Sequence, residues 1–166
     1  MSGEPILVLT TGGTIDKNYF DALSEYQIVD SGIPALLQQA RVALPHRVEE
    51  VCRKDSLELT DADRAEIARR AREAPETRVV ITHGTDTMTE TARVLAAAVP
   101  GKTIVLTGAL SPARFADTDA PFNLGMAFAA AQIAPRGVYI AMSGQIFDGL
   151  KVRKDRDAGR FVVQEA

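Results

Sequence analysis

The sequence lacks several features that commonly direct the assignment of a function. It contains one cysteine, Cys52, which excludes an internal disulfide and suits a reducing cytoplasm. No apolar run reaches the roughly 20 residues of a membrane-spanning helix. No basic stretch precedes Ile6, so we expect no secretory signal. The net charge of −3, without a basic run, argues against nucleic acid and against anionic membranes as partners.

Motifs for phosphate, metal and serine-hydrolase chemistry are also missing. The sequence has no Gly-x-x-x-x-Gly-Lys-Ser/Thr loop, no Gly-x-Gly-x-x-Gly fingerprint and no Gly-x-Ser-x-Gly elbow. His46 and His83 are not spaced as metal ligands, so we expect no metal and no organic cofactor. Cys52 lies in an apolar segment, where a core position is a better interpretation than a nucleophile.

The composition is that of an ordinary globular domain. The 166 residues are 46% hydrophobic and 25% charged. A chain of this length buries roughly two-thirds of the surface that it exposes when unfolded. We see no repeat or linker and therefore expect residues 1–166 to form a single domain with a full core.

Short apolar runs alternate with helical patterns along the chain. Strands buried on both faces are predicted at 6–9, 79–82, 103–107 and 138–142, with a further strand at 47–52. Helices are predicted at 34–40, 61–73, 88–98 and 121–132. The helix at 61–73 follows a capping box at Thr60 and is expected to turn its alanines inward and its arginines outward. This alternation predicts an α/β fold: a doubly wound, mostly parallel sheet with helices on both faces.

Two segments interrupt this alternation. Residues 16–30 are polar and aromatic without a clear period, and we expect a mobile loop that closes over a ligand; an ordinary surface loop is the alternative. The pair Asp148-Gly149 signals a turn and predicts a β-hairpin near the C-terminus. Residues 151–166 then read as a charged tail.

Polar groups follow three of the predicted strands. Thr14 comes after the first strand, Thr85 and Asp86 after the second, and Gly108-Ala109 after the third. In open α/β sheets ligands bind outside the carboxyl ends of the strands, so these groups are expected to meet there. Hydroxyls, backbone amides and a carboxylate suit acyl transfer, which needs a nucleophile, an activating group and donors for an oxyanion. For Thr14 alone, a structural threonine in a polar turn is an equal alternative.

The complete set of motifs resembles the bacterial-type L-asparaginase family. In chain order the motifs are Thr11-Gly12-Gly13-Thr14-Ile15, Thr82-His83-Gly84-Thr85-Asp86-Thr87-Met88, Thr107-Gly108-Ala109, Asp119-Ala120-Pro121-Phe122-Asn123-Leu124, and Asp148-Gly149 with Val152-Arg153-Lys154. They extend over nearly the whole chain. The second motif is the most specific, and the ordered set is more specific still.

The resemblance implies a set of catalytic residues. Thr14 matches the threonine nucleophile, and Tyr26 matches the loop tyrosine that assists it. Thr85 and Asp86 match the second threonine and the aspartate beside it, and Lys154 matches the lysine grouped with them. Which of the two threonines attacks is left open by the sequence.

The resemblance also implies a substrate-binding set. Ser56 matches the serine that holds the substrate carboxylate, and Asp86 matches the aspartate that meets the substrate amino group. Thr85, Gly13 and Ala109 are expected to line the same site. No metal site is implied.

The implied reaction is hydrolysis of L-asparagine to L-aspartate and ammonia through a threonine acyl-enzyme, with weak glutaminase activity as a further expectation. Two other readings stay open: an amidase acting on a different or larger amide, and a non-catalytic amino-acid-binding module. A doubly wound sheet does not separate them, because it hosts many functions.

The chain differs from the family in length. Family members are about twice as long and carry a smaller C-terminal domain, so we expect a short, single-domain member in the cytoplasm. The family assembles as tetramers, and the apolar segments Pro121–Gln132 and Ile146-Phe147 offer surface for contact. We therefore expect a homo-oligomer, either a dimer or a tetramer.

Overall fold

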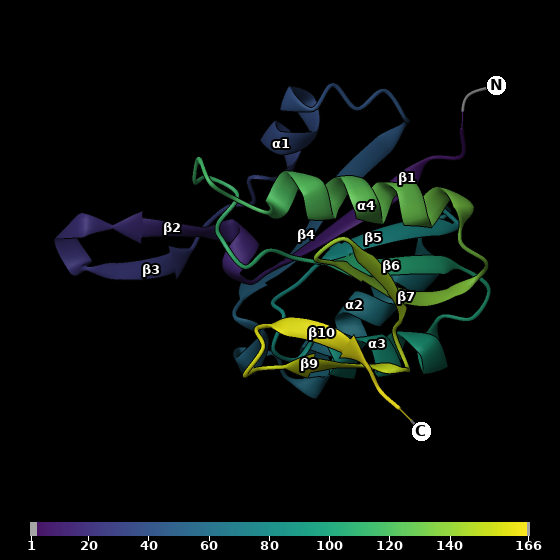
Figure 1. Ribbon diagram of the computed structural model, residues 1–166. Coiled ribbons are helices and arrows are strands. Elements are labelled where there is room, and N and C mark those ends of the chain that lie inside the picture. Colours follow the sequence, from purple (N-terminus) through teal and green to yellow (C-terminus); the bar gives the residue numbers. More distant parts are fainter. Residues whose placement is uncertain (1–2, 166) are drawn as a thin grey trace.

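The computed structural model describes residues 3–165 and has the predicted α/β architecture (Figure 1). Its main sheet has six strands in the order β4-β1-β5-β6-β7-β8. The first five run parallel, and β8 pairs antiparallel with β7. The strands are β1 (Ile6–Gly12), β4 (His46–Lys54), β5 (Arg78–Thr82), β6 (Thr103–Thr107), β7 (Gly137–Met142) and β8 (Gln145–Asp148). The prediction of a mostly parallel sheet is confirmed.

Four α-helices cover the two faces of this sheet (Figure 1). They are α1 (Ile33–Gln39), α2 (Asp61–Glu73), α3 (Met88–Ala98) and α4 (Ala120–Ile133). Helices α2 and α3 pack on one face, and α1 and α4 pack on the other. The described residues also form three short 3-10 helices: η1 (Thr14–Asp16), η2 (Asp21–Leu23) and η3 (Ser56–Glu58).

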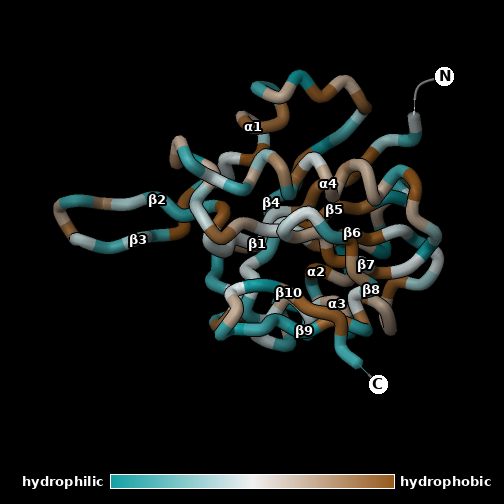
Figure 2. The backbone as a smooth tube through the Cα atoms, in the orientation of Figure 1, coloured by the Kyte–Doolittle hydropathy of each residue, from teal (hydrophilic) through white to brown (hydrophobic). Residues whose placement is uncertain are grey.

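The alternation of side chains along each strand divides the core into two layers. In β1, Leu7 and Leu9 face α2 and α3, whereas Ile6 and Val8 face α1 and α4, and all four are fully buried. A strand buried on both faces must be apolar throughout, which is why these runs could be read from the sequence. Hydrophobic stretches of chain gather in the strands of the sheet in Figure 2.

Residues 17–28 differ from the prediction of an irregular loop. They form a hairpin of β2 (Lys17–Phe20) and β3 (Glu25–Ile28), which projects from the body of the molecule (Figure 1). Tyr19 and Tyr26 pair across the two strands with ring centroids 5.1 Å apart. The prediction of irregular structure was wrong because each strand has only four residues. The turn also uses Ser24 at φ 49 rather than the glycine that usually signals such a turn.

The C-terminal region contains the predicted hairpin, with two corrections. The turn between β7 and β8 is Ser143-Gly144, with both residues at positive φ, and not Asp148-Gly149, which follows β8. The expected charged tail forms a second hairpin of β9 (Val152–Asp155) and β10 (Arg160–Val163). Val152 and Phe161 from this hairpin are buried in the main core, so its apolar residues anchor what looked like a solvated tail.

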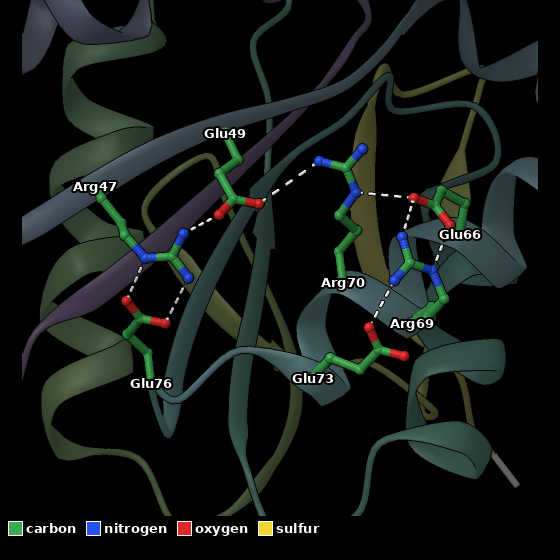
Figure 3. Close-up of polar contacts among 7 residues, drawn as sticks. All are labelled: Arg47, Glu49, Glu66, Arg69, Arg70, Glu73 and Glu76. Atoms are coloured by element: carbon green, nitrogen blue, oxygen red, sulfur yellow. Dashed lines mark hydrogen bonds and ion pairs between the residues drawn. The ribbon is translucent and has the colours of Figure 1, made fainter.

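Charged residues connect the edge strand β4 to α2 and to the turn that follows α2 (Figure 3). Arg47 binds the carboxylate of Glu76, with Nη2 donating to Oε2 at 2.9 Å, and also pairs with Glu49. Arg70 on α2 lies 3.6 Å from Glu49 Oε2 and donates to Glu66 Oε1 at 2.8 Å. These contacts form a chain of alternating charges that links β4 to α2 and to Glu76.

Candidate active site

Three predicted site residues are joined by hydrogen bonds at the carboxyl end of the sheet. Lys154 Nζ donates to Thr85 Oγ1 and to Asp86 Oδ1, both at 2.7 Å. Thr85 and Asp86 lie in the loop between β5 and α3, whereas Lys154 comes from β9. The side chains of Lys154 and Asp86 are 17% and 32% exposed, so the pair is shielded but reachable from solvent. The C-terminal hairpin thus delivers a cation to the end of β5.

Close backbone contacts bring the ends of β1, β5 and β4 together. Gly13 has φ 84, and a Cβ on it would lie 2.5 Å from the backbone nitrogen of Gly84. A Cβ on Gly84 would in turn lie 2.7 Å from the Cβ of Ser56. Only glycine permits both approaches. The two glycines therefore let Ser56 and the residue before Thr14 lie directly against the loop that carries Thr85.

Ser56 is buried in η3, with 1% of its surface exposed. Its Oγ accepts a hydrogen bond from Thr87 N at 3.3 Å. A hydroxyl that accepts from a backbone amide still has its own proton to donate. Ser56 is therefore suited to donate to an anionic group.

Thr14 and Tyr26 line one cavity of about 320 Å³. The other residues around it are Lys17, Leu110, Ser111, Pro112 and Phe115. Tyr26 is 52% exposed, and its ring centroid lies 6.0 Å from that of Phe115. The projecting hairpin thus forms one wall of the cavity beside Thr14.

Ala109 lies at the end of β6 and is 2% exposed. Its methyl group belongs to the core layer beneath α4. Any contribution to a ligand site would therefore come from its backbone. The preceding Gly108 lies against the carbonyl of His83, where no side chain would fit.

Two charged residues that the sequence did not single out stand beside this site. Lys17 lines the cavity and pairs with Asp55, with 3.2 Å between Nζ and Oδ2. Burial acts to raise the pKa of Asp55, but the hydrogen bonds from Leu57 N and Lys17 and the charges of Lys17 and Lys154 outweigh it and lower the pKa. No motif or spacing in the sequence signals this pair.

Asp16 is a third residue that sequence reasoning missed. It is 1% exposed, and its Oδ1 accepts from Ser31 Oγ at 2.8 Å and from Gly32 N at 3.3 Å. Its backbone oxygen accepts from Val29 N at 3.1 Å. Burial raises the pKa of this carboxyl to about 6, although the hydrogen bonds oppose the shift. Asp16 thus ties together the two ends of the β2–β3 hairpin.

The remaining candidates do not form a reactive centre. Burial raises the pKa of Cys52 to about 11, and its Sγ contacts Thr11 O at 3.4 Å, so it is a neutral thiol at pH 7. Across residues 3–165, no group of three or more His, Cys, Asp or Glu side chains is arranged to hold a metal ion. Within the same residues, no helix has the length and apolar character required to cross a membrane.

Comparison with known proteins identifies the family. The family model described as "Asparaginase, N-terminal" matches residues 5–161, so the chain belongs to the asparaginase family. The resemblance read from the motifs is confirmed.

Individual relatives show how much of the family's length is present. L-asparaginase 2 of Escherichia coli is 34% identical over 159 residues, which are 90% of this chain and 46% of that protein. A glutamyl-tRNA(Gln) amidotransferase subunit of Pyrobaculum aerophilum is 36% identical over 148 residues, 81% of this chain and 34% of that protein. The solved structure of the thermostable L-asparaginase from Thermococcus kodakarensis matches with a TM-score of 0.84 at 29% identity, covering 96% of this chain and 51% of its own. The chain thus spans about half the length of the curated L-asparaginases that it matches.

Proposed function

We propose that residues 1–166 form one domain of the asparaginase N-terminal type, which hydrolyses L-asparagine to L-aspartate and ammonia. The observation that carries the proposal is the cluster in which Lys154 donates to both Thr85 and Asp86, next to the strand end that holds Thr14. Such a cluster supplies hydroxyls, a cation and a carboxylate at one point, as amide hydrolysis requires. Membership of the asparaginase family supports the same reaction.

The proposed reaction proceeds through a threonine ester. Thr14 Oγ attacks the side-chain amide carbon while the Tyr26 hydroxyl accepts the Thr14 proton and donates its own to the amide nitrogen, and the C–N bond then breaks to release ammonia. Water then attacks the ester, which releases L-aspartate and restores the hydroxyl. We assign the attack to Thr14 because the Thr85 oxygen already accepts from Lys154 Nζ, which lowers its nucleophilicity. Thr85 and Lys154 are then proposed to serve the proton transfers.

Ser56 and Asp86 are proposed to bind the parts of the substrate that do not react. The Ser56 proton would be donated to the α-carboxylate, and the Asp86 carboxylate would accept from the α-ammonium. Each charge-assisted bond of this kind is worth about 1.5–3 kcal/mol. Gly13 and the backbone of Ala109 are proposed to line the same space.

An ammonia-release assay tests this function against its alternatives. We expect turnover of L-asparagine, with weaker release from L-glutamine. An amidase for larger amides is the second candidate, favoured by the relative named as part of an amidotransferase; it would release ammonia from a glutaminyl ester or peptide amide but not from free asparagine. Saturable L-aspartate binding without ammonia release from any amide would instead indicate a binding module.

Location and assembly are further proposals. The single cysteine favours the cytoplasm. Phe122, Ile133 and Ile146 are 65%, 84% and 43% exposed, and we propose that such apolar surface is covered in a homo-oligomer, a dimer or a tetramer. Light scattering should give a multiple of 17.9 kDa, and a mass equal to 17.9 kDa at micromolar concentration would contradict the proposal.

A further inference from the structure

Arg64 on α2 is a buried charged side chain with three hydrogen bonds close to the candidate site. The sequence predicted that the arginines of this helix point outward, and for Arg64 this is wrong, because it is only 5% exposed. Its Nη1 donates to Leu59 O at 3.0 Å, its Nη2 to Thr87 Oγ1 at 2.9 Å and its Nε to Thr91 Oγ1 at 3.2 Å. Glu90 Oε2 lies 3.3 Å from Nη2 and balances the charge.

The directions of the bonds beyond Arg64 follow from which groups can only donate and which can only accept. A guanidinium has only donors, so the Thr87 and Thr91 oxygens must accept from it. The Thr87 hydroxyl then donates to Ser56 O at 2.7 Å. A carbonyl oxygen can only accept, so His83 Nδ1 carries the ring proton and donates it to Gly84 O at 2.6 Å. Nε2 of the neutral ring therefore accepts from the Thr91 hydroxyl at 2.7 Å.

Two chains of hydrogen bonds therefore leave one guanidinium and end in two different loops. One chain ends at Ser56, after β4, and the other ends at Gly84, directly before Thr85 and Asp86. The intermediate side chains of His83, Thr87 and Thr91 are all buried, so water does not compete for their bonds. Burial also lowers the pKa of His83 to about 4, so the ring stays neutral and the order of donors is the same across physiological pH.

We infer that Arg64 is a positioning residue that sets the separation between Ser56 and the Thr85–Asp86 pair. The inference rests on the proposed function, in which these residues grip the carboxylate and the ammonium of one substrate. Arg64 itself is fixed by α2, whose start is held by a capping box between Thr60 and Asp63. A lysine at this position has a single nitrogen and could not bond three acceptors in a planar fork.

Steady-state kinetics of Arg64→Met test this role. A substrate site displaced by about 1 Å can lose about 100-fold in rate. We expect kcat/KM for L-asparagine to fall ~10–100-fold, mostly through a higher KM, with partial recovery in Arg64→Lys. Arg69→Met is the matched control, because Arg69 lies on the same helix, is 45% exposed and pairs only with Glu66 and Glu73 among the described residues. A lower melting temperature with unchanged KM would mean that Arg64 only stabilises the fold, which would overturn the inference.

Variants that break one chain at a time keep the test decisive if Arg64→Met does not fold. Thr87→Val removes the chain to Ser56, and Thr91→Val removes the chain to His83, each with little change in volume. We expect either variant to raise KM. Folded Thr87→Val and Thr91→Val proteins that both keep the wild-type KM would overturn the inference.

Hydrogen exchange separates this inference from the proposed function. In Arg64→Met, or in Thr87→Val if the former does not fold, we expect faster exchange of the residue 87 amide, which donates to Ser56 Oγ in the wild type. Wild-type protein that releases no ammonia would reject the proposed function, and the exchange result would still report on Arg64. Unchanged exchange at this amide would show that Arg64 does not hold the two loops.

Discussion

Two parts of the candidate site, the loop at 83–87 and the β2–β3 hairpin, differ in how the rest of the structure holds them. The loop at 83–87 is tied to α2, to α3 and to η3 by buried hydrogen bonds, and His83 and Thr87 are almost inaccessible to solvent. The β2–β3 hairpin exposes Tyr19, Leu23 and Tyr26, at 41%, 59% and 52%. Figure 2 shows the hairpin as a largely hydrophilic arm that stands away from the body. In the proposed function, the loop at 83–87 fixes the geometry of the reaction and the hairpin admits the substrate.

The largest effect is expected from removing Lys154, the cation that contacts the loop at 83–87. Lys154→Met leaves Asp86 and Thr85 without their shared donor, and we expect kcat to fall ~10⁴-fold, as for other members of catalytic units. Lys151→Met is the control, because Lys151 lies just before the same hairpin and is 76% exposed. Turnover near the wild-type value in Lys154→Met would remove this lysine from the mechanism.

The β2–β3 hairpin is expected to contribute to the reaction through one hydroxyl, that of Tyr26. Tyr26→Phe keeps the ring contacts with Tyr19 and Phe115 but removes the group proposed to accept the Thr14 proton. We expect kcat to fall ~10²–10⁴-fold, the range for a lost acid–base group. Tyr19→Phe, made on the paired strand, should have little effect. Equal losses in the two variants would point to a structural defect in the hairpin.

The attachment of the β2–β3 hairpin is expected to depend on pH through Asp16, which ties its two ends together. Its pKa is about 6 in the folded protein and 3.8 as the ordinary value, so between these pH values the folded state binds the proton more tightly than the unfolded state does. The free energy of unfolding should therefore fall as pH rises from 4 to 6, by up to about 3 kcal/mol. Asp16→Asn keeps an oxygen for Ser31 and Gly32 and carries no charge.

Denaturant unfolding at pH 4 and pH 8 measures this contribution. We expect Asp16→Asn to be more stable than wild type at pH 8, with the difference largely lost at pH 4. Asp21→Asn, in the exposed η2 of the hairpin, serves as the control. A pH dependence that is the same in wild type and Asp16→Asn would exclude the buried carboxyl as its source.

The smallest expected effect is a change in hydrogen exchange on binding. With saturating L-aspartate, we expect amides of residues 17–28 to gain protection as the hairpin closes over the ligand. Amides at 83–87 should change little, because their loop is already fixed without a ligand. Equal protection of the hairpin in both states would count against its role as a lid.

The parts of the fold that the sequence predicts well are those where one requirement dominates. Strands β5 and β6 are apolar throughout their centres because both faces are buried, and α3 and α4 begin near Thr87 and Pro121 as the pattern indicates. The β2–β3 hairpin was missed because it packs on little, so its residues carry no periodic apolar signal. The C-terminal hairpin was missed because only two of its residues, Val152 and Phe161, enter the core.

The residues of the candidate site also differ in how well the sequence predicts their place. Thr14, Thr85 and Asp86 follow predicted strands, and the sheet explains why they converge. Lys154 reaches Thr85 and Asp86 through a hairpin that no local pattern indicated, so its place depended on the family resemblance. Arg64 lies in a helix rich in exposed arginines, and nothing in the local sequence separates it from them. Its burial depends on contacts with Thr87 and Thr91, which are distant in sequence.

The charges of the edge strand β4 disfavour aggregation between copies of this chain. Five of its nine residues are Arg, Lys or Glu, and two of them, Arg47 and Glu49, already pair with Glu76 and with Arg70 of α2 (Figure 3). A long edge strand has unpaired backbone N–H and C=O groups, with which a strand of another molecule can pair unless such pairing is disfavoured. An incoming strand would have to strip water from these charges and meet like charges in register. Fibril-like growth from β4 is thereby disfavoured, both in the folded protein and while the sheet is assembling.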